Sequence, residues 1–250
     1  MALTITPLHV GTMPNFSKAA ITYGRNHAEL VDVAIIMFAI RGGDHTVIVD
    51  TGTGSPDDVR AKHGFTLVRP PEQEPLAALE RAGIDPADVG TVVHTHLHWD
   101  HCSNNHLFPN ARFVVQQSEL QYAVDPMPPN RATYERRPGM VPVWMPSIGS
   151  IETVSGDVPL LPGISLVHLP GHSPGSQGVV VEAAGGRYLV AGDCITYHDN
   201  WTGDERLAHI PTGGLTSMYD FMDSFEKIER LDCQVIPSHD PRVLDVEVYA

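Results

Sequence analysis

Residues 94–101 read HTHLHWDH, and this stretch decides how the rest of the chain is interpreted. It follows an apolar, β-branched run that predicts a strand, and residues two apart at the end of a strand point the same way. His96 and His98 can therefore bind one metal ion, and a turn after them can bring Asp100 and His101 to a second. Imidazole nitrogens and carboxylate oxygens are good zinc ligands. Three histidines and an aspartate in six residues thus predict a metal site rather than a hydrogen-bonded polar loop.

Three further residues of ligand type stand where other apolar runs stop. His172 follows one such run, Asp193 follows a second and His239 follows a third. Active sites of α/β proteins tend to lie at the carboxyl ends of strands. We therefore expect these side chains to meet the 94–101 cluster at one edge of the fold.

Apolar runs rich in β-branched residues predict buried or half-buried strands. They lie at Val31–Ile40, Thr46–Val49, Thr91–His94, Arg112–Val115, Ile164–Leu169, Gly178–Val181, Arg187–Val190 and Gln234–Ile236. Strands interleaved with a few helices imply an α/β layered domain, although this pattern alone does not choose among such folds. A length of 250 residues is ordinary for one such domain, so we expect residues 1–250 to form a single domain.

Two helices are predicted between the strands. Glu74–Ala82 has acids in its first turn, and Gly83 can cap its end. In Ser217–Leu231, apolar side chains recur at helical spacing and predict one core-facing stripe. The stripe consists of Met218, Phe221, Met222, Phe225 and Ile228.

Residues 125–150 differ from the rest because they are rich in proline and carry no strand or helix pattern. Loops this long are usually lids, binding loops or flexible segments. We expect this segment to form a lid or a substrate-binding loop, or alternatively a surface excursion or dimer contact.

Composition restricts the partners. The chain has 16 basic and 30 acidic residues, a formal net charge of −14, which disfavours nucleic acid or an anionic membrane as a partner. No apolar run approaches the ~20 residues that span a bilayer, and the N-terminus lacks a basic region followed by an apolar one. The three cysteines form no C-x-x-C pair. We expect a soluble protein in the cytoplasm.

Four motifs together resemble those of the metallo-β-lactamase superfamily: HTHLHWDH, LPGHSPGS (residues 169–176), AGD (191–193) and SHD (238–240). Asp50, in the stretch VIVDTG, matches the first motif of that family, where an aspartate supports the metal ligands from behind them. The resemblance runs from about residue 31 to residue 239. It implies an αββα sandwich, in which two mixed β-sheets are flanked by helices.

The resemblance also implies a ligand set and a cofactor. One zinc would be held by His96, His98 and His172, and the other by Asp100, His101 and His239, with Asp193 bridging the two. This gives two Zn²⁺ per chain, with Mn²⁺ or Fe²⁺ as the other metals that such ligands accept.

Within the superfamily, HWDHCSNNHLFPNA (residues 98–111) resembles the N-acyl-homoserine lactonases, which are quorum-quenching enzymes, and related small-lactone hydrolases. This implies that a metal-bridging hydroxide opens a small lactone and that Asp100 passes the proton. The lactonases carry a tyrosine shortly after the bridging aspartate, which hydrogen-bonds the lactone carbonyl. Tyr197 is expected to take that role, with Thr196 and His198 as weaker candidates for the same space.

The substituent of the lactone is expected to lie against apolar loop residues. The side chains proposed to line this pocket are Met13, Phe16, Trp144 and Met145. Each of them can equally belong to the core or to a subunit contact. Homodimers are common among such enzymes, and no residue in this sequence indicates or opposes one.

Other reactions on the same fold stay open as alternatives. They include hydrolysis of another small ester, a thioester or a cyclic amide, and an iron-dependent reaction like that of persulfide dioxygenases. A β-lactamase proper is disfavoured because Asp193 stands where its commonest class has a zinc-binding cysteine. The acidic balance opposes a nuclease, and the intact set of ligands opposes a non-catalytic scaffold.

Overall fold

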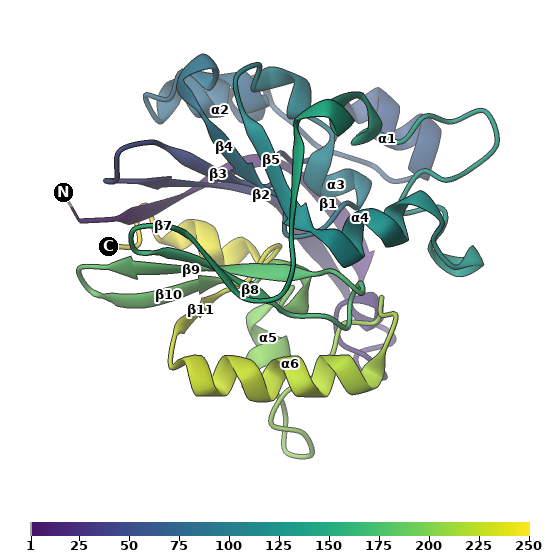
Figure 1. Cartoon of the computed structure of the whole chain (residues 1–250). Helices are drawn as coiled ribbons and strands as arrows, with labels where there is room; N and C mark the ends of the chain where they lie inside the picture. Colours follow the sequence, from purple (N-terminus) through teal and green to yellow (C-terminus); the bar gives the residue numbers. More distant parts are fainter. Residues whose placement is uncertain (1) are drawn as a thin grey trace.

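The computed structural model describes residues 2–250, and two β-sheets pack face to face in it with helices on their outer sides (Figure 1). This arrangement confirms the predicted αββα sandwich with two mixed sheets. In Figure 1, α1 to α4 lie on one side of the sheets, and α5 and α6 lie on the other.

The first sheet has six strands in the order β1-β2-β3-β4-β5-β6. Its β1, β2 and β3 are antiparallel neighbours, whereas β3 to β6 run parallel. Its strands are β1 (Thr4–Ser17), β2 (Leu30–Arg41), β3 (Val47–Val49), β4 (Thr91–Val93), β5 (Arg112–Gln116) and β6 (Ile151–Val154).

The second sheet has five strands in the order β11-β10-β9-β8-β7. Only the pair β10 and β11 is parallel in it. Its strands are β7 (Val158–Leu161), β8 (Ile164–His168), β9 (Gln177–Ala183), β10 (Gly186–Val190) and β11 (Gln234–Ile236).

Six α-helices cover the sheets within the described residues. They are α1 (Pro56–His63), α2 (Pro75–Arg81), α3 (Trp99–Cys102), α4 (Gln117–Val124), α5 (His198–Thr202) and α6 (Met218–Leu231). None of the helices between residues 2 and 250 has the length and apolar character that a membrane crossing requires.

Strand β2 shows why the sandwich forms. Ile35 and Met37 lie in a cluster with Leu79 of α2, whereas Ile36 and Phe38 lie in a cluster with strands of the second sheet. Successive side chains of a strand point to opposite faces, so a continuous apolar run such as that of β2 is buried on both. The second cluster is the layer between the two sheets.

The predicted strands are all present, with ends that differ by at most two residues. The 14-residue β1 was not predicted, because Pro7, Gly11 and Pro14 interrupt its pattern and its register shifts twice against β2. The short edge strands β6 and β7 were also missed, as were α1, α3, α4 and α5. Helix α1 buries only Val59, so its sequence carries almost no apolar stripe.

Helix α6 confirms three of the five residues of the predicted stripe, and Met218 is only half-buried. Phe221, Phe225 and Ile228 pack against the second sheet, and the Ser217 side chain accepts a hydrogen bond from the backbone N–H of Asp220 as a cap. Met222 is 41% exposed. It belongs to the solvent-facing side, because the buried stripe covers a narrower arc than the spacing suggested.

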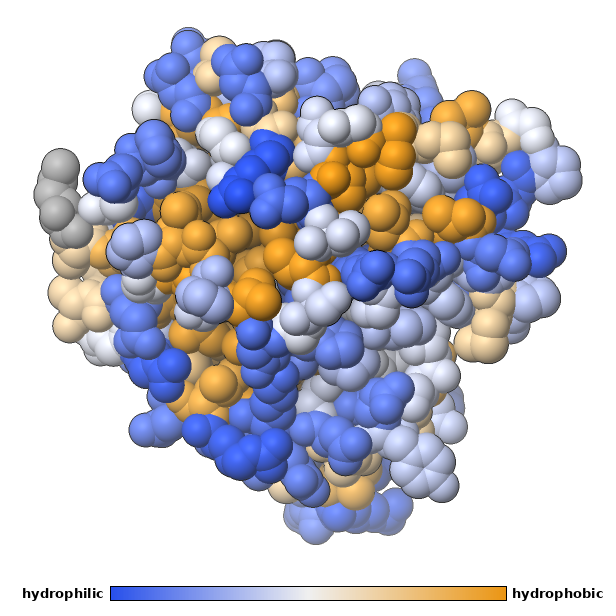
Figure 2. Space-filling model, viewed as in Figure 1, coloured by the Kyte–Doolittle hydropathy of each residue, from blue (hydrophilic) through white to orange (hydrophobic). Residues whose placement is uncertain are grey.

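Segment 125–150 consists of turns, with short 3-10 helices at Pro128–Asn130 and Met145–Ser150. Figure 2 shows apolar side chains gathered on the face that is viewed in Figure 1. Within segment 125–150, the side chains of Met127, Val141 and Ile148 are exposed. Its role as a lid or as a contact surface stays a prediction.

Candidate metal centre

The seven predicted ligands come from both sheets. Four of them follow β4, in the loop that leads into α3 and on α3 itself, and the others follow β8, β10 and β11. Their ligand atoms form three overlapping groups, each with its atoms within 4.8 Å of one another. The groups are His96/His98/His172, His96/His101/Asp193 and Asp100/His101/His239.

Hydrogen bonds behind the histidines fix which ring nitrogen faces the site. The Nδ1–H of His172 donates to the carbonyl oxygen of Gly214 (2.6 Å), and that of His239 donates to the carbonyl oxygen of Ala34 (2.8 Å). His101 donates from Nδ1 to a carboxylate oxygen of Asp50 (2.8 Å). In each of these rings the Nε2 lone pair is therefore left for a ligand.

These lone pairs point at one another. Nε2 of His172 lies 3.0 Å from Nδ1 of His98, and Nε2 of His239 lies 3.2 Å from Nε2 of His101. Burial lowers the pKa of His98 well below its usual value, so that this ring is neutral as a metal ligand must be. Buried lone pairs that face each other repel unless a proton or a metal ion lies between them. The donor set and its convergence therefore fit divalent metal ions.

Asp193 lies between the two ends of the cluster. Its Oδ1 is 3.4 Å from Nε2 of His101 and 3.2 Å from Nε2 of His239, and its Oδ2 is 3.5 Å from Nε2 of His172. The hydroxyl of Ser238 donates to Oδ1 (2.7 Å) and holds the carboxylate in this orientation. One oxygen thus faces each half of the site, which is the geometry that a bridging carboxylate needs.

Asp50 stands behind the ligands, as the resemblance implied. It accepts hydrogen bonds from the backbone N–H of Thr95 (2.8 Å), from the Thr95 hydroxyl (2.7 Å) and from His101. Burial raises the pKa of Asp50, but the neighbouring His101 outweighs this effect and lowers the pKa to about 2. Asp50 is therefore ionised, and it orients His101.

Glu119 was not predicted, and it ties two ligand loops together. Its side chain is fully buried. One oxygen accepts from the backbone N–H of Leu97 (2.9 Å) and from the Tyr134 hydroxyl (2.7 Å). The other accepts from the Ser173 hydroxyl (2.5 Å) and from the backbone N–H of Gly175 (3.2 Å). The loops that carry His98 and His172 are therefore joined through one carboxylate.

A cleft of about 210 Å³ opens at the cluster. Ligands His98, Asp100, His172, Asp193 and His239 form part of its wall. The apolar part consists of Met13, Phe16, Ala20, Ile21, Val33, Phe65 and Trp99, and the polar part includes Asn130, Thr133, Thr196 and Thr212. The structure thus brings Met13 and Phe16 to the place that was predicted for them, and Phe65 joins them there.

The structure does not bring Tyr197, Trp144 or Met145 to the cleft, and these three assignments are corrected. The Tyr197 hydroxyl donates to the backbone oxygen of Asp32, and Tyr197 does not line the cleft. Trp144 is 1% exposed and belongs to a separate hydrophobic cluster that also contains Tyr134. Met145 packs against that cluster. His198 is also turned away, because its Nδ1 donates to Asp240 (2.7 Å).

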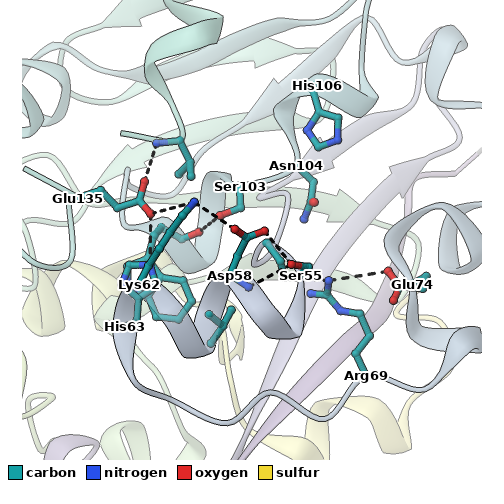
Figure 3. Close-up of a pocket in the computed structure, with 14 residues that line it drawn as sticks. Ser55, Asp58, Lys62, His63, Arg69, Glu74, Ser103, Asn104, His106 and Glu135 are labelled. Carbon is teal, nitrogen blue, oxygen red and sulfur yellow. Dashed lines mark hydrogen bonds and ion pairs between the residues drawn. The ribbon is translucent and has the colours of Figure 1, made fainter. Parts of the chain in front are cut away.

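Trp99 separates the cleft from a second hollow of about 330 Å³, which Figure 3 shows. On that side the ring of His63 stacks on the indole at a centroid distance of 3.9 Å. The buried carboxylate of Glu135 lies 3.3 Å from His63 Nε2 and accepts from the backbone N–H of Val143 (2.8 Å). Lys62 lies between Glu135 and Asp58. The ring of His63 thus supports Trp99 on this side.

Two sheets between helices, with histidine and aspartate side chains gathered where the strands end, define the class of metal-binding αββα proteins. A family model described as the metallo-beta-lactamase superfamily matches residues 33–239. The chain therefore belongs to the metallo-beta-lactamase superfamily.

The chain is similar to curated proteins named N-acyl homoserine lactonase AttM. It is 34% identical to the one from Azorhizobium caulinodans over 176 residues, which cover 66% of this chain and 64% of that protein. It is 32% identical to the one from Rhizobium radiobacter over 217 residues, which cover 80% of this chain and 78% of that protein. The matched region thus spans less than two thirds of the Azorhizobium relative.

Solved structures share the fold. A mutant of B. thuringiensis AiiA with N-decanoyl-L-homoserine bound at its active site superposes with a TM-score of 0.77 at 19% identity, over 97% of this chain and 95% of that one. AidC, described as a dizinc quorum-quenching lactonase, gives 0.71 at 16% identity, over 96% and 88%.

Removal of metal by a chelator is expected to lower the melting temperature by about 5–10 °C, because bound ions stabilise only the folded state and join loops of both sheets. Scanning calorimetry before and after dialysis against the chelator, with zinc added back, measures this change. The same chelator saturated with zinc is the control. An unchanged melting temperature after complete metal removal would show that the bound ions do not join the loops of the two sheets.

Proposed function

We propose that this protein is a metal-dependent hydrolase that opens a small lactone, with N-acyl-homoserine lactones as the substrate class and two Zn²⁺ as the cofactor. The observation that carries the proposal is the position of Asp193 between two groups of ligands, beside a cleft with an apolar wall. The similarity to proteins named N-acyl homoserine lactonase supports the choice of substrate.

The chain's own residues divide the work. Two divalent ions held by these ligands would polarise the lactone carbonyl and lower the pKa of a water molecule. Asp100 lines the cleft, where its carboxylate would take and return a proton. Trp99 and Phe65 lie on the apolar side, where they exclude water and bind the substituent of the ring.

The test is the metal content of the purified protein together with a pH-stat screen. The panel contains lactones, including N-acyl-homoserine lactones of several chain lengths, one glutathione thioester and one β-lactam. About two zinc ions per chain and release of acid from lactones are expected. Iron as the bound metal, or cleavage of the thioester or the β-lactam alone, would overturn the lactonase proposal and leave the family assignment intact.

The apolar wall gives a prediction about chain length. Phe65 lies 5.5 Å from Phe16 and 6.2 Å from Trp99, measured between ring centroids, so these rings form one continuous surface. Phe65→Ser is expected to raise KM about tenfold for a long-chain N-acyl lactone and to leave KM for a short-chain lactone nearly unchanged, since only the long chain reaches this surface.

Steady-state kinetics on a chain-length series measure this difference. Val68→Ser is the matched control, because Val68 is 52% exposed and does not line the cleft. An equal change of KM for short and long chains would contradict the placement of the substituent at Phe65.

A further inference from the structure

The chain after Asp193 can present only one of two neighbouring hydroxyls to the cleft. Residues Ile195 and Tyr197 have extended backbone angles, and successive side chains of an extended chain point to opposite sides. The Tyr197 hydroxyl is bound to the backbone oxygen of Asp32, away from the cleft. Thr196 therefore faces the cleft, and it lines the wall beside Asp193 and His239.

Backbone hydrogen bonds hold Thr196 in register with the metal ligands. The N–H of His239 donates to the carbonyl oxygen of Thr196 (3.0 Å), and the N–H of Ser238 donates to that of Ile195 (3.0 Å). The first bond involves a ligand, and the second involves the residue that orients Asp193. The backbone of Thr196 is thus fixed relative to the site, and its hydroxyl can move only by rotation about χ1.

This hydroxyl has no hydrogen-bond partner among residues 2–250. The two other threonines in the cleft differ, because Thr133 donates to the carbonyl oxygen of Asn130 (2.8 Å) and Thr212 donates to that of Gly214 (2.8 Å). Thr196 is only 4% exposed, and what remains accessible faces the cleft. Its oxygen is open to the cleft, so the hydroxyl can donate to a ligand there without giving up an internal hydrogen bond.

We propose that Thr196 donates a hydrogen bond to the carbonyl oxygen of the substrate and so takes the role that the resemblance assigned to Tyr197. This inference rests on the proposed lactone hydrolysis. A threonine hydroxyl lies close to the backbone, so the substrate carbonyl approaches the turn between Asp193 and Thr196 closely. The space that a tyrosine ring would occupy is then free for the ring of the lactone or its substituent.

The experiment compares Thr196→Val, Thr196→Ser and Tyr197→Phe in the zinc-loaded protein, with a lactone that the wild type hydrolyses. Thr196→Val keeps the shape and removes the donor, so kcat/KM is expected to fall about ten- to hundredfold, mainly in kcat, because this bond strengthens as charge develops on the oxygen. Thr196→Ser should stay within about threefold of the wild type. Zinc content and melting temperature of both variants should be unchanged.

Tyr197→Phe is the matched control. It removes the hydroxyl bound to Asp32, so a small loss of stability and a kcat/KM within about twofold of the wild type are expected.

The inference would be overturned by Thr196→Val at wild-type turnover, by Thr196→Ser as slow as the valine variant, or by a larger loss in Tyr197→Phe. In each of these results the wild type still hydrolyses lactones, so the proposed function would stand. A wild type that opens no lactone on the panel would remove the proposed function and this inference together.

Discussion

Replacement of Asp193 by alanine is expected to remove both metal ions and all measurable activity. The carboxylate faces His101 and His239 with one oxygen and His172 with the other. Its loss takes a ligand from each half of the site and also removes the negative charge that offsets two divalent cations. Both ions are then held only by neutral rings and Asp100.

Elemental analysis of the purified variant measures this loss. Asp199→Ala serves as the control, because Asp199 pairs with Lys18 and Arg242 on the surface and contacts no ligand. Retention of two ions per chain by the Asp193 variant would contradict the assigned bridge.

Replacement of Glu119 by alanine is expected to lower the free energy of unfolding by more than about 3 kcal/mol. Four donors, two of them backbone N–H groups, lose their acceptor in a site without access to water. The loops that carry His98 and His172 are then no longer joined. The affinity for the ion that these histidines share should therefore fall more than the affinity at Asp100, His101 and His239.

Denaturant unfolding and a two-step zinc titration measure the two effects. Glu226→Ala is the control, because Glu226 is exposed on α6 and pairs only with Arg230; its replacement should change the free energy of unfolding by less than about 0.5 kcal/mol. If Glu119→Ala had the stability of the wild type and bound zinc at both halves of the site with wild-type affinity, this carboxylate would not hold the loops.

The fold was predictable for elements whose own residues show a clear pattern of buried apolar side chains. Strand β2 is apolar on both faces and α6 has one apolar stripe, so each could be identified from its own residues. Strand β1 could not, because its place depends on pairing with β2 across two shifts of register. The strand pattern did not choose the fold, and the motifs of the family did.

The site divides in the same way. The ligand residues stand in short motifs after strands, so their convergence could be expected before the structure was known. The direction of the Tyr197 side chain depends on its position in an extended chain, where successive side chains point to opposite sides. Thr196, one residue earlier, faces the cleft, so Tyr197 points away from it. Trp144 packs in a separate hydrophobic cluster and not in the wall of the cleft. Glu119 gave no signal, because its four partners lie in loops far apart in the chain.

The position of Trp99 gives the protein an optical probe of its own. The indole meets the cleft on one side and the ring of His63 on the other. The other two tryptophans lie elsewhere, since Trp144 is buried in a separate cluster and Trp201 stacks on His209. An acyl chain that binds against Trp99 would change the fluorescence of this indole alone. Binding of a ligand in the cleft can therefore be followed by tryptophan fluorescence in the metal-free protein, where no turnover takes place.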